Sequence, residues 1–257
     1  MDFFRSLAIA FSMYSAIPMP QFQWDQKNYE HSFAFFPLVG AGLSAVLYFA
    51  YRGLVWLGTD SMAESLILTA IIVIYTGGFH IDGYMDTMDA LCSHRSRDEK
   101  IQIMKDPHIG AFGVIQLVVL ALLMTAGIYE LLVRGRFYSL LFAFVVSRAL
   151  SGVGVCTFKR RDNNTSLIRF ETKGSRQFTL TLMFIYVFAV LAISFMSRNS
   201  SVIIATLVCV VWLFISKLIC EKEFSGISGD TSGYFLCICE AGFVWSVALD
   251  TALRAHI

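Results

Sequence analysis

Long hydrophobic runs, each broken by a short polar segment, fill most of this sequence from residue 33 onward. A helix needs about 20 mainly apolar residues to cross a bilayer, and in lipid it satisfies its own backbone hydrogen bonds. The pattern therefore predicts an all-α, polytopic integral membrane protein with about seven transmembrane helices of this length. We expect the spans at residues 33–50, 62–79, 111–131, 138–157, 178–196, 201–216 and 234–252.

The segment before the first span has a different pattern. Arg5 precedes an apolar run that contains Ser12, Tyr14 and Ser15, and no small-residue cleavage site of a signal peptide follows it. We therefore expect an N-terminal interfacial or re-entrant helix. Residues 1–257 contain no internal repeat and no low-complexity linker, so we expect a single membrane-embedded domain.

Composition supports the membrane interpretation and excludes other classes. Charged residues make up 15% of the chain and hydrophobic residues 56%, whereas soluble domains carry about 25% charged residues. The net charge of +1 leaves no basic domain for nucleic acid. The six cysteines show no zinc-ligand spacing, and disulfide frameworks belong to small secreted domains. We therefore expect the lipid bilayer and small molecules as partners.

Positive charges are distributed unequally over the predicted loops. The N-terminal segment and the loops at 80–110, 158–177 and 217–233 hold fourteen Lys and Arg residues, and the opposite side holds five. Basic residues concentrate on the cytoplasmic side of membrane proteins. We therefore expect a multi-pass protein of the cytoplasmic membrane whose three polar loops face the cytoplasm.

Three aspartates follow the second predicted span, within the sequence GGFHIDGYMDTMDA. Their spacing places Asp82, Asp86 and Asp89 within an arc of about 60° on one helix. Carboxylates on one face repel each other unless a cation lies among them, and Mg²⁺ typically binds one or two carboxylates together with substrate phosphates. We predict a Mg²⁺ site, with Mn²⁺ as the other candidate ion. The alternative is a solvated helix start that Asp82 caps.

Neighbouring residues extend this candidate site. His80 is either a substrate contact or an interfacial histidine. Gly83 either leaves room for the close approach of a ligand or eases the turn into the helix. A short amphipathic helix is expected at 96–105, because a serine and a glutamate at its start have capping-box spacing. It is followed by Asp106. Lys105 at its end either holds a phosphate or anchors the chain to lipid headgroups.

Two further polar segments belong to the same predicted face. The loop at 159–176 holds six basic residues, and Arg161 has the planar guanidinium that can clamp a phosphate; topology and anionic lipid are the alternative explanation. Arg148, inside the fourth span, needs a buried carboxylate partner such as Glu240. The sequence GISGDTSG places Asp230 at the entrance of the last span, where it suits a metal or ligand contact as well as a plain loop.

One membrane face is thus expected to combine carboxylates, a lysine and a basic loop. Metal ions can hold a diphosphate and stabilise its leaving group, while a spare carboxylate accepts the proton of an attacking hydroxyl. No serine, cysteine or histidine stands in a recognisable nucleophile motif. From the residues alone we predict a membrane enzyme of phosphoryl or nucleotidyl-diphosphate transfer.

The sequences GGFHIDGYMDTMDAL and KIQIMKDPHIGAFGVI closely resemble the central motifs of the cobalamin synthase family, also called adenosylcobinamide-GDP ribazoletransferase. The family pattern is roughly G-G-hydrophobic-H-hydrophobic-D-G-x-x-D-x-x-D-A, followed by I-M-K-D-x-x-I-G-x-x-G. Shorter similarities at 17–20, 35–43, 147–150 and 228–233 extend the resemblance over nearly the whole chain.

The resemblance implies a late step in the assembly of the cobalamin nucleotide loop. The ribose hydroxyl of α-ribazole, or of its 5′-phosphate, attacks adenosylcobinamide-GDP, GMP leaves, and adenosylcobalamin or its 5′-phosphate forms, with Mg²⁺ required. Other corrinoid-assembly enzymes or a second copy of the chain are further expected partners. Catalytic roles fall to Asp86, to Lys105 and to Asp89, the expected base. The implied metal ligands are Asp82, Asp86, Asp89 and Asp230. The expected substrate-binding residues are His80, Gly83, Lys105, Asp106, Arg148 and Arg161.

The family has a third motif, G-D-x-x-G-A-x-x-E. The corresponding residues here, 229–237, read GDTSGYFLC and depart from this pattern. Tyr234 replaces the alanine, Cys237 stands at the position of the glutamate, and the nearest glutamate is Glu240, one helical turn later. The first motif therefore carries most of the resemblance.

Two other functions use similar residues. A CDP-alcohol phosphotransferase also has spaced aspartates at the membrane edge, but Met85 and Asp86 stand where its D-G-x-x-A-R pattern requires Ala-Arg. A cation transporter would place its acidic residues in the middle of the bilayer between inverted repeats, whereas these aspartates follow a span. The transferase agrees best with the sequence.

Overall fold

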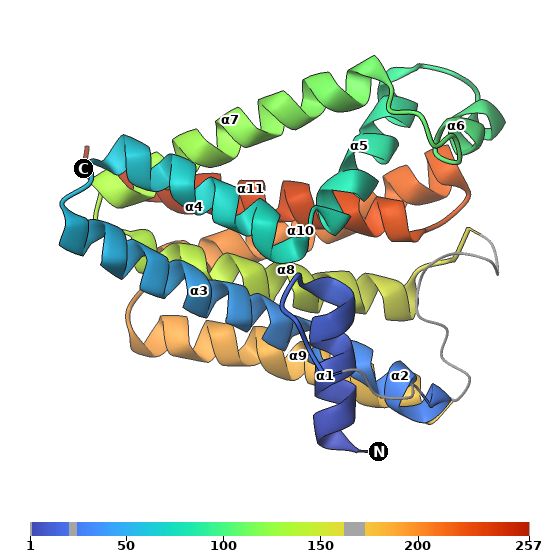
Figure 1. Ribbon diagram of the computed structural model, residues 1–257, viewed down its shortest axis with the longest axis horizontal. Coiled ribbons are helices and arrows are strands. Elements are labelled where there is room, and N and C mark those ends of the chain that lie inside the picture. Colours follow the sequence, from blue (N-terminus) through green and yellow to red (C-terminus); the bar gives the residue numbers. More distant parts are fainter. Residues whose placement is uncertain (1, 21–24, 162–172, 257) are drawn as a thin grey trace.

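The computed structural model describes residues 2–20, 25–161 and 173–256. Within these ranges long helices lie side by side in an elongated bundle, and shorter helices gather toward one end (Figure 1). The helices are α1 (Phe3–Tyr14), α2 (Gln26–Ser32), α3 (Phe36–Leu57), α4 (Ser61–Thr76), α5 (Phe79–Cys92), α6 (Arg97–Ile103), α7 (Ala111–Val133), α8 (Phe137–Thr157), α9 (Lys173–Met196), α10 (Ser200–Phe224) and α11 (Gly229–Arg254), with a 3₁₀ turn, η1 (Phe33–Phe35), before α3.

The apolar helices confirm the predicted all-α, polytopic membrane fold. Six helical segments of the described chain are long and apolar enough to cross a membrane, and the count rises to seven if α4 and α5 form one bent span. The predicted boundaries differ most at α10, which continues to Phe224, and before α3, where α2 and η1 are additional helical turns.

A sharp bend separates α4 from α5. The two helices meet at 94°, and the residues between them, Gly77 and Gly78, have φ values of +64° and +78°. Glycine adopts this left-handed conformation without the steric cost of a Cβ atom. The second predicted span, 62–79, is therefore wrong at its end: α4 stops at Thr76, and α5 turns across the end of the bundle.

Helix α8 lies at the centre of the bundle, in contact with α3, α9, α10 and α11. Of its most apolar stretch 72% is buried, whereas the corresponding value for the peripheral α9 is 22%. Small residues allow α3 to approach α8 closely: Gly40 lies against the Phe144 carbonyl, and the Ser44 hydroxyl donates to the Leu141 carbonyl at 2.7 Å. The protein core is thus built around α8.

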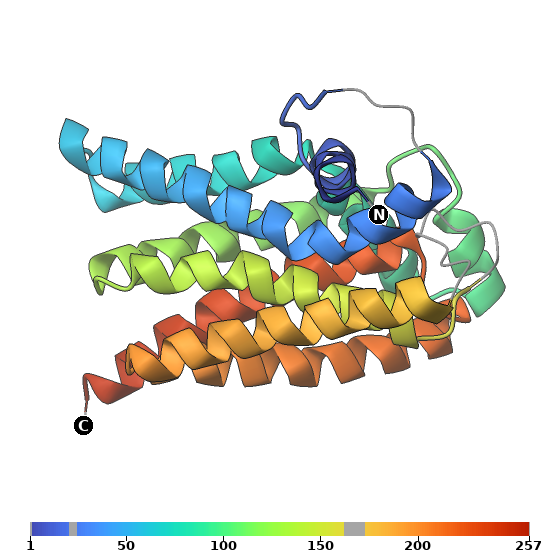
Figure 2. The ribbon, with the colours of Figure 1, turned by 90° about the horizontal axis from the view of Figure 1, so that it is seen from below.

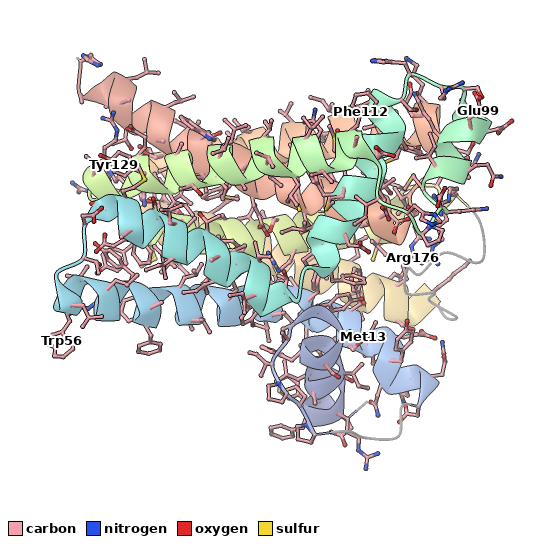
Figure 3. All side chains as sticks on the ribbon, turned by 45° about the horizontal axis from the view of Figure 1, so that its top comes forward. Met13, Trp56, Glu99, Phe112, Tyr129 and Arg176 are labelled. Carbon is pink, nitrogen blue, oxygen red and sulfur yellow. The ribbon has the colours of Figure 1, made fainter. Side chains whose placement is uncertain are left out.

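The two ends of the bundle carry different elements. Glu99 and Arg176 lie toward one end, and Trp56 and Tyr129 toward the opposite end (Figure 3). We call the first the polar end and define it as the end that holds α5, α6, residues 159–161 and the start of α11. The loops α3–α4, α7–α8 and α9–α10 lie at the other end (Figure 1).

The N-terminal helix α1 runs across the direction of the long helices. Figure 2 shows α1 nearly along its axis while the spans extend sideways. Its 12 residues give a length of about 18 Å, too short to cross a bilayer. Phe4 is 78% exposed, whereas Ser6 and Asn28 are buried and joined by a hydrogen bond of 3.3 Å. The predicted short apolar helix is present, with one side against α2 and the other exposed.

Candidate active site

The acidic stripe, defined as Asp82, Asp86 and Asp89, lies on α5. The helix is continuous over Phe79–Cys92 and begins after Gly78, so the predicted grouping of the three aspartates on one helix face is confirmed. Asp82 is exposed, and Asp86 and Asp89 are half-buried. Asp82 lies in the first turn and Gly78 is the N-cap residue. The alternative in which Asp82 caps the helix is therefore wrong.

Two glycines bring α5 against α11. A Cβ atom at Gly83 would lie 2.7 Å from the Asp230 Cα, and one at Gly233 would lie 2.6 Å from the His80 carbonyl oxygen. Any larger side chain would push the helices apart. The sequence predicted that Gly83 leaves room for a ligand, but in the structure the backbone of Asp230 takes this room.

This crossing brings Asp230 into the electrostatic surroundings of the acidic stripe. Asp82, Asp89 and Asp230 all lie close enough to act on the charge of Asp86. Among the described residues, no lysine, arginine or histidine forms an ion pair with a member of the acidic stripe. Like charges at this spacing favour a bound cation.

The segment between α6 and α7 covers part of the acidic stripe. A crevice there is lined by Asp86, Asp89, His108, Ile109 and Gly110 among others. A Cβ atom at Gly110 would collide with the Asp89 carboxylate. The Gly113 N–H lies 3.3 Å from Asp89 Oδ1 and donates a hydrogen bond to it. The two glycines of the second motif therefore fit the backbone around Asp89.

His108 is a residue of this crevice that the sequence did not indicate. Its Nδ1 lies 2.6 Å from Asp106 Oδ1, and its backbone N–H donates to the same oxygen at 2.9 Å. The hydrogen bonds from His108 lower the pKa of Asp106. Asp106, predicted as a substrate contact, is thus engaged with His108 on the exposed surface of the loop.

Helix α6 is fixed to the end of α10. The predicted capping box is confirmed, because the Ser96 N–H donates to Glu99 Oε2 at 3.0 Å and the Ser96 side chain accepts from the third helical residue. Lys100 pairs with Glu223 at 2.5 Å. These contacts hold α6 at the polar end. Lys105 follows in the exposed turn that leads to His108.

Arg161 lies beside the loop between α10 and α11. Its backbone N–H donates to the Ile227 carbonyl at 3.0 Å, and the Ile227 N–H donates to the Lys159 backbone carbonyl at 2.9 Å. The guanidinium of Arg161 acts electrostatically on Asp230. The structure therefore brings Arg161 to Asp230, as the candidate site requires. Residues 162–172 of the predicted basic loop lie outside the described residues.

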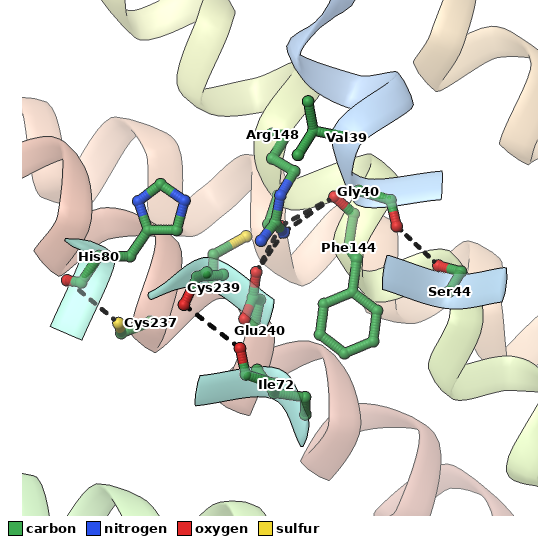
Figure 4. A network of polar contacts seen from close by, with 12 residues as sticks. Val39, Gly40, Ser44, Ile72, His80, Phe144, Arg148, Cys237, Cys239 and Glu240 are labelled. Carbon is green, nitrogen blue, oxygen red and sulfur yellow. Dashed lines mark hydrogen bonds and ion pairs between the residues drawn. The ribbon is translucent and has the colours of Figure 1, made fainter. Parts of the chain in front are cut away.

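Arg148 is buried in the core, with 1% of its surface exposed. Its guanidinium lies 2.5 Å from Glu240 Oε1 (Figure 4) and donates to the Phe144 carbonyl at 3.1 Å. The Ser147 hydroxyl donates to the same glutamate at 3.1 Å. The predicted partner of Arg148 is confirmed. The structure places this residue in an internal ion pair and does not bring it to the acidic stripe.

His80 and Cys237 lie where α5 and α11 meet. The Cys237 thiol donates to the His80 carbonyl at 3.6 Å (Figure 4), and both residues are buried. The cysteine at the glutamate position of the family pattern therefore contacts the backbone of α5, one helical turn before Glu240.

The donor set of the acidic stripe can be compared with the needs of a metal ion. Among the described residues, no three His, Cys, Asp or Glu side chains converge closely enough to hold an ion by themselves. Mg²⁺ often takes only one or two protein carboxylates and completes its shell with water and substrate phosphates. The carboxylates of the acidic stripe, which form no ion pair with a described basic residue, fit an ion that is shared with a diphosphate.

Comparisons with known proteins identify the family. The model of the cobalamin-5-phosphate synthase family matches residues 6–248. The chain belongs to this family. The predicted resemblance is thereby confirmed, and the chain is a transferase of cobalamin biosynthesis. No solved structure matches the chain.

Curated relatives cover nearly the full length of the chain. A protein of Lachnoclostridium phytofermentans is 35% identical over 93% of this chain and 92% of its own length. One of Clostridium perfringens is 32% identical over 93% and 95%, and one of Escherichia coli is 29% identical over 91% and 95%. All three are named adenosylcobinamide-GDP ribazoletransferase.

Proposed function

We propose that this protein joins α-ribazole, or its 5′-phosphate, to adenosylcobinamide-GDP in a Mg²⁺-dependent reaction. The products are adenosylcobalamin, or its 5′-phosphate, and GMP. The names of the relatives supply the substrates. The observation that carries the chemistry is the meeting of the acidic stripe, Asp230 and Arg161 at one end of the bundle.

Each charged residue of the polar end has a role in this proposal. Asp82, Asp86 and Asp230 supply oxygens for Mg²⁺, which when bound neutralises the diphosphate and stabilises the departing GMP. Arg161 and Lys105 bind phosphate oxygens. Arginine suits this task because its planar fork matches a phosphate.

Asp89 is the proposed general base. Its carboxylate is held by the Gly113 N–H and lies against Gly110, so its position is fixed by α7 as well as α5. It accepts the proton of the attacking ribose hydroxyl. The hydroxyl oxygen forms a bond to the phosphorus that carries the cobinamide, and the bond from that phosphorus to the oxygen of GMP breaks.

Water-soluble nucleotides must reach the polar end for this reaction. Asp82 and Lys105 are exposed there, and the basic residues of the chain concentrate on the same side. We propose that the polar end faces the cytoplasm, in agreement with the distribution of positive charge.

The proposal is tested by turnover of the full chain in liposomes. GMP release and cobalamin formation are expected with Mg²⁺ or Mn²⁺, and both are expected to stop when EDTA is added. The matched control is Asp98→Asn, which removes an exposed acid of α6 at the same end and is expected to retain activity.

Other outcomes contradict the proposal. Lack of a cobalamin product from the folded wild-type protein rejects it. Transfer from a CDP-alcohol substrate, or uptake of Mn²⁺ into the liposomes without turnover, favours one of the two other functions that share spaced aspartates.

A further inference from the structure

An aromatic hollow lies beside the first turn of α11, and the proposed phosphate chemistry does not use it. We define the aromatic hollow by the side chains of its wall, which come from α1, η1, α3 and α5: Tyr14, Phe33, Phe36, Phe79 and His80. It encloses about 410 Å³ of space that protein atoms do not fill, part of it open to solvent.

The rings of the wall pack against one another. The centroids of Tyr14 and Phe36 are 4.5 Å apart, and Phe33 stacks on Phe36 at 5.4 Å with an angle of 17° between the planes. Aromatic side chains favour stacked and edge-to-face contacts with other rings. The hollow therefore suits a flat, largely apolar aromatic group.

His80 provides a polar atom in this wall. The residue is 6% exposed, and its Nε2 has no hydrogen-bond partner among the described residues. Its ring lies 5.8 Å from the Phe36 centroid and 5.6 Å from the Phe79 centroid. A buried polar atom without a partner is costly. A ligand with one hydrogen-bonding nitrogen would remove this cost.

The opposite side of the hollow leads to the proposed reaction site. Gly229, Ser232 and Gly233 line it, and they flank Asp230 in the first turn of α11. A nucleoside whose base lies in the hollow would therefore have its ribose near Asp230. The first turn of α11 thus borders both the hollow and the proposed reaction site.

We propose that the aromatic hollow binds the planar base of the acceptor nucleoside, with a free ring nitrogen of the base accepting a hydrogen bond from the His80 Nε2–H. This inference rests on the proposed function, because it takes the acceptor to be a riboside of a nitrogen heterocycle. Guanine of the donor is the other planar group in the reaction. Guanine presents two acceptors and an amino group, whereas the polar side chains that line the hollow, apart from the ring of Tyr14, are those of His80, Ser151 and Ser232. A base with one free ring nitrogen needs fewer polar partners.

The test is steady-state kinetics of the full chain in liposomes with two acceptors. One is benzimidazole riboside, and the other is indole riboside, in which a C–H replaces the free ring nitrogen. For the wild type we expect a KM about tenfold higher for the indole compound, the effect of roughly one lost hydrogen bond. In His80→Leu we expect the benzimidazole KM to rise about as much and the difference between the acceptors to vanish. The KM for adenosylcobinamide-GDP should stay unchanged.

Two further variants separate the hollow from general packing. Tyr14→Leu removes a wall ring and is expected to raise the KM of both acceptors equally. Tyr51→Leu is the matched control: Tyr51 stacks on Phe137, with centroids 3.9 Å apart, in α3 near the opposite end of the bundle. It is expected to change neither acceptor KM.

Several results would overturn the inference. One is an equal KM of the wild type for both acceptors, a result that does not depend on the folding of any variant. Another is a His80→Leu protein that still discriminates between them, and a third is a rise in the donor KM alone, which would assign the hollow to guanine. If the wild type has no turnover, the proposed function fails. Calorimetric titration of the wild type with benzimidazole riboside then tests the hollow by itself, and absence of binding rejects it.

Discussion

Glu240 and the acidic stripe are negative charges in contrasting surroundings. Glu240 is deep in the bundle and is paired with Arg148 and Ser147. The three aspartates of the stripe are half-buried or exposed, and they form no ion pair with a described basic residue. A buried charge is tolerated when it is paired, so the first arrangement is explained by folding alone.

The difference indicates which acidic residues serve chemistry. Neighbouring carboxylates that lack a counter-charge weaken the folded state, and such arrangements are typical of functional sites. The surrounding backbone keeps them in place: Gly83 and Gly110 are the positions where a side chain would displace Asp230 or Asp89. We conclude that the polar end is arranged around the acidic stripe, with which no described basic residue forms an ion pair.

The largest expected effect is on turnover. Asp86→Asn keeps the shape of the side chain and removes its charge, so we expect kcat to fall about 1,000-fold, which corresponds to the several kcal/mol that a metal-held charge supplies. The thermal unfolding temperature should stay the same or rise, because repulsion within the stripe decreases. The measurement is GMP release together with thermal unfolding in detergent. Full activity of Asp86→Asn would show that the acidic stripe, like the pair of Glu240 and Arg148, does not serve catalysis.

The core pair is expected to respond in the opposite way. Arg148→Met leaves Glu240 buried without its partner and should destabilise the fold by about 3–5 kcal/mol. The double variant Arg148→Met, Glu240→Met should recover most of this loss. Unfolding in detergent at increasing denaturant checks the series. A single variant as stable as the wild type would show that the pair does not maintain the fold.

Gly110→Ala tests the backbone around the stripe. A Cβ atom at this position collides with the Asp89 carboxylate, so kcat should fall roughly 10- to 100-fold, as expected when a catalytic group is misplaced by about 1 Å. The matched control is Gly53→Ala in α3, where nothing lies within 4 Å of the added atom. Equal activity of both variants would contradict a precise position for Asp89.

The smallest effect is expected at the capping box of α6. Ser96→Ala removes the side chain that accepts a hydrogen bond at the start of the helix, and the cost is about 1 kcal/mol. Faster amide hydrogen exchange confined to α6 is expected, with a change in turnover of less than about threefold, since 1.4 kcal/mol corresponds to tenfold. Loss of protection throughout the bundle would show that α6 stabilises more than its own turn.

Hydrophobic runs were sufficient to predict the long helices, because a lipid environment requires continuous apolar segments. The stripe on α5 and the capping box were also predicted, since both depend on spacing within one helix. The pairing of Arg148 with Glu240 followed from the cost of an unpaired buried charge. These features depend either on spacing within one helix or on the high free-energy cost of an unpaired buried charge.

The remaining features depend on the relative directions of helices. Hydropathy could not predict the 94° bend at Gly77–Gly78, although two adjacent glycines after an apolar run are a signal for it. The place of His108 beside Asp89 depends on the path of a loop. The aromatic hollow combines rings from α1, α3 and α5, which are separate in the sequence and meet only in the folded bundle.

The most direct test of the acidic stripe is Mn²⁺ binding, followed by electron paramagnetic resonance on the full chain in detergent. With adenosylcobinamide-GDP present, the wild type is expected to bind Mn²⁺ tightly, and Asp86→Asn about tenfold or more weakly, because a charged oxygen ligand is lost. Asp98→Asn should bind like the wild type. Equal Mn²⁺ affinity in the wild type and in Asp86→Asn would contradict the account.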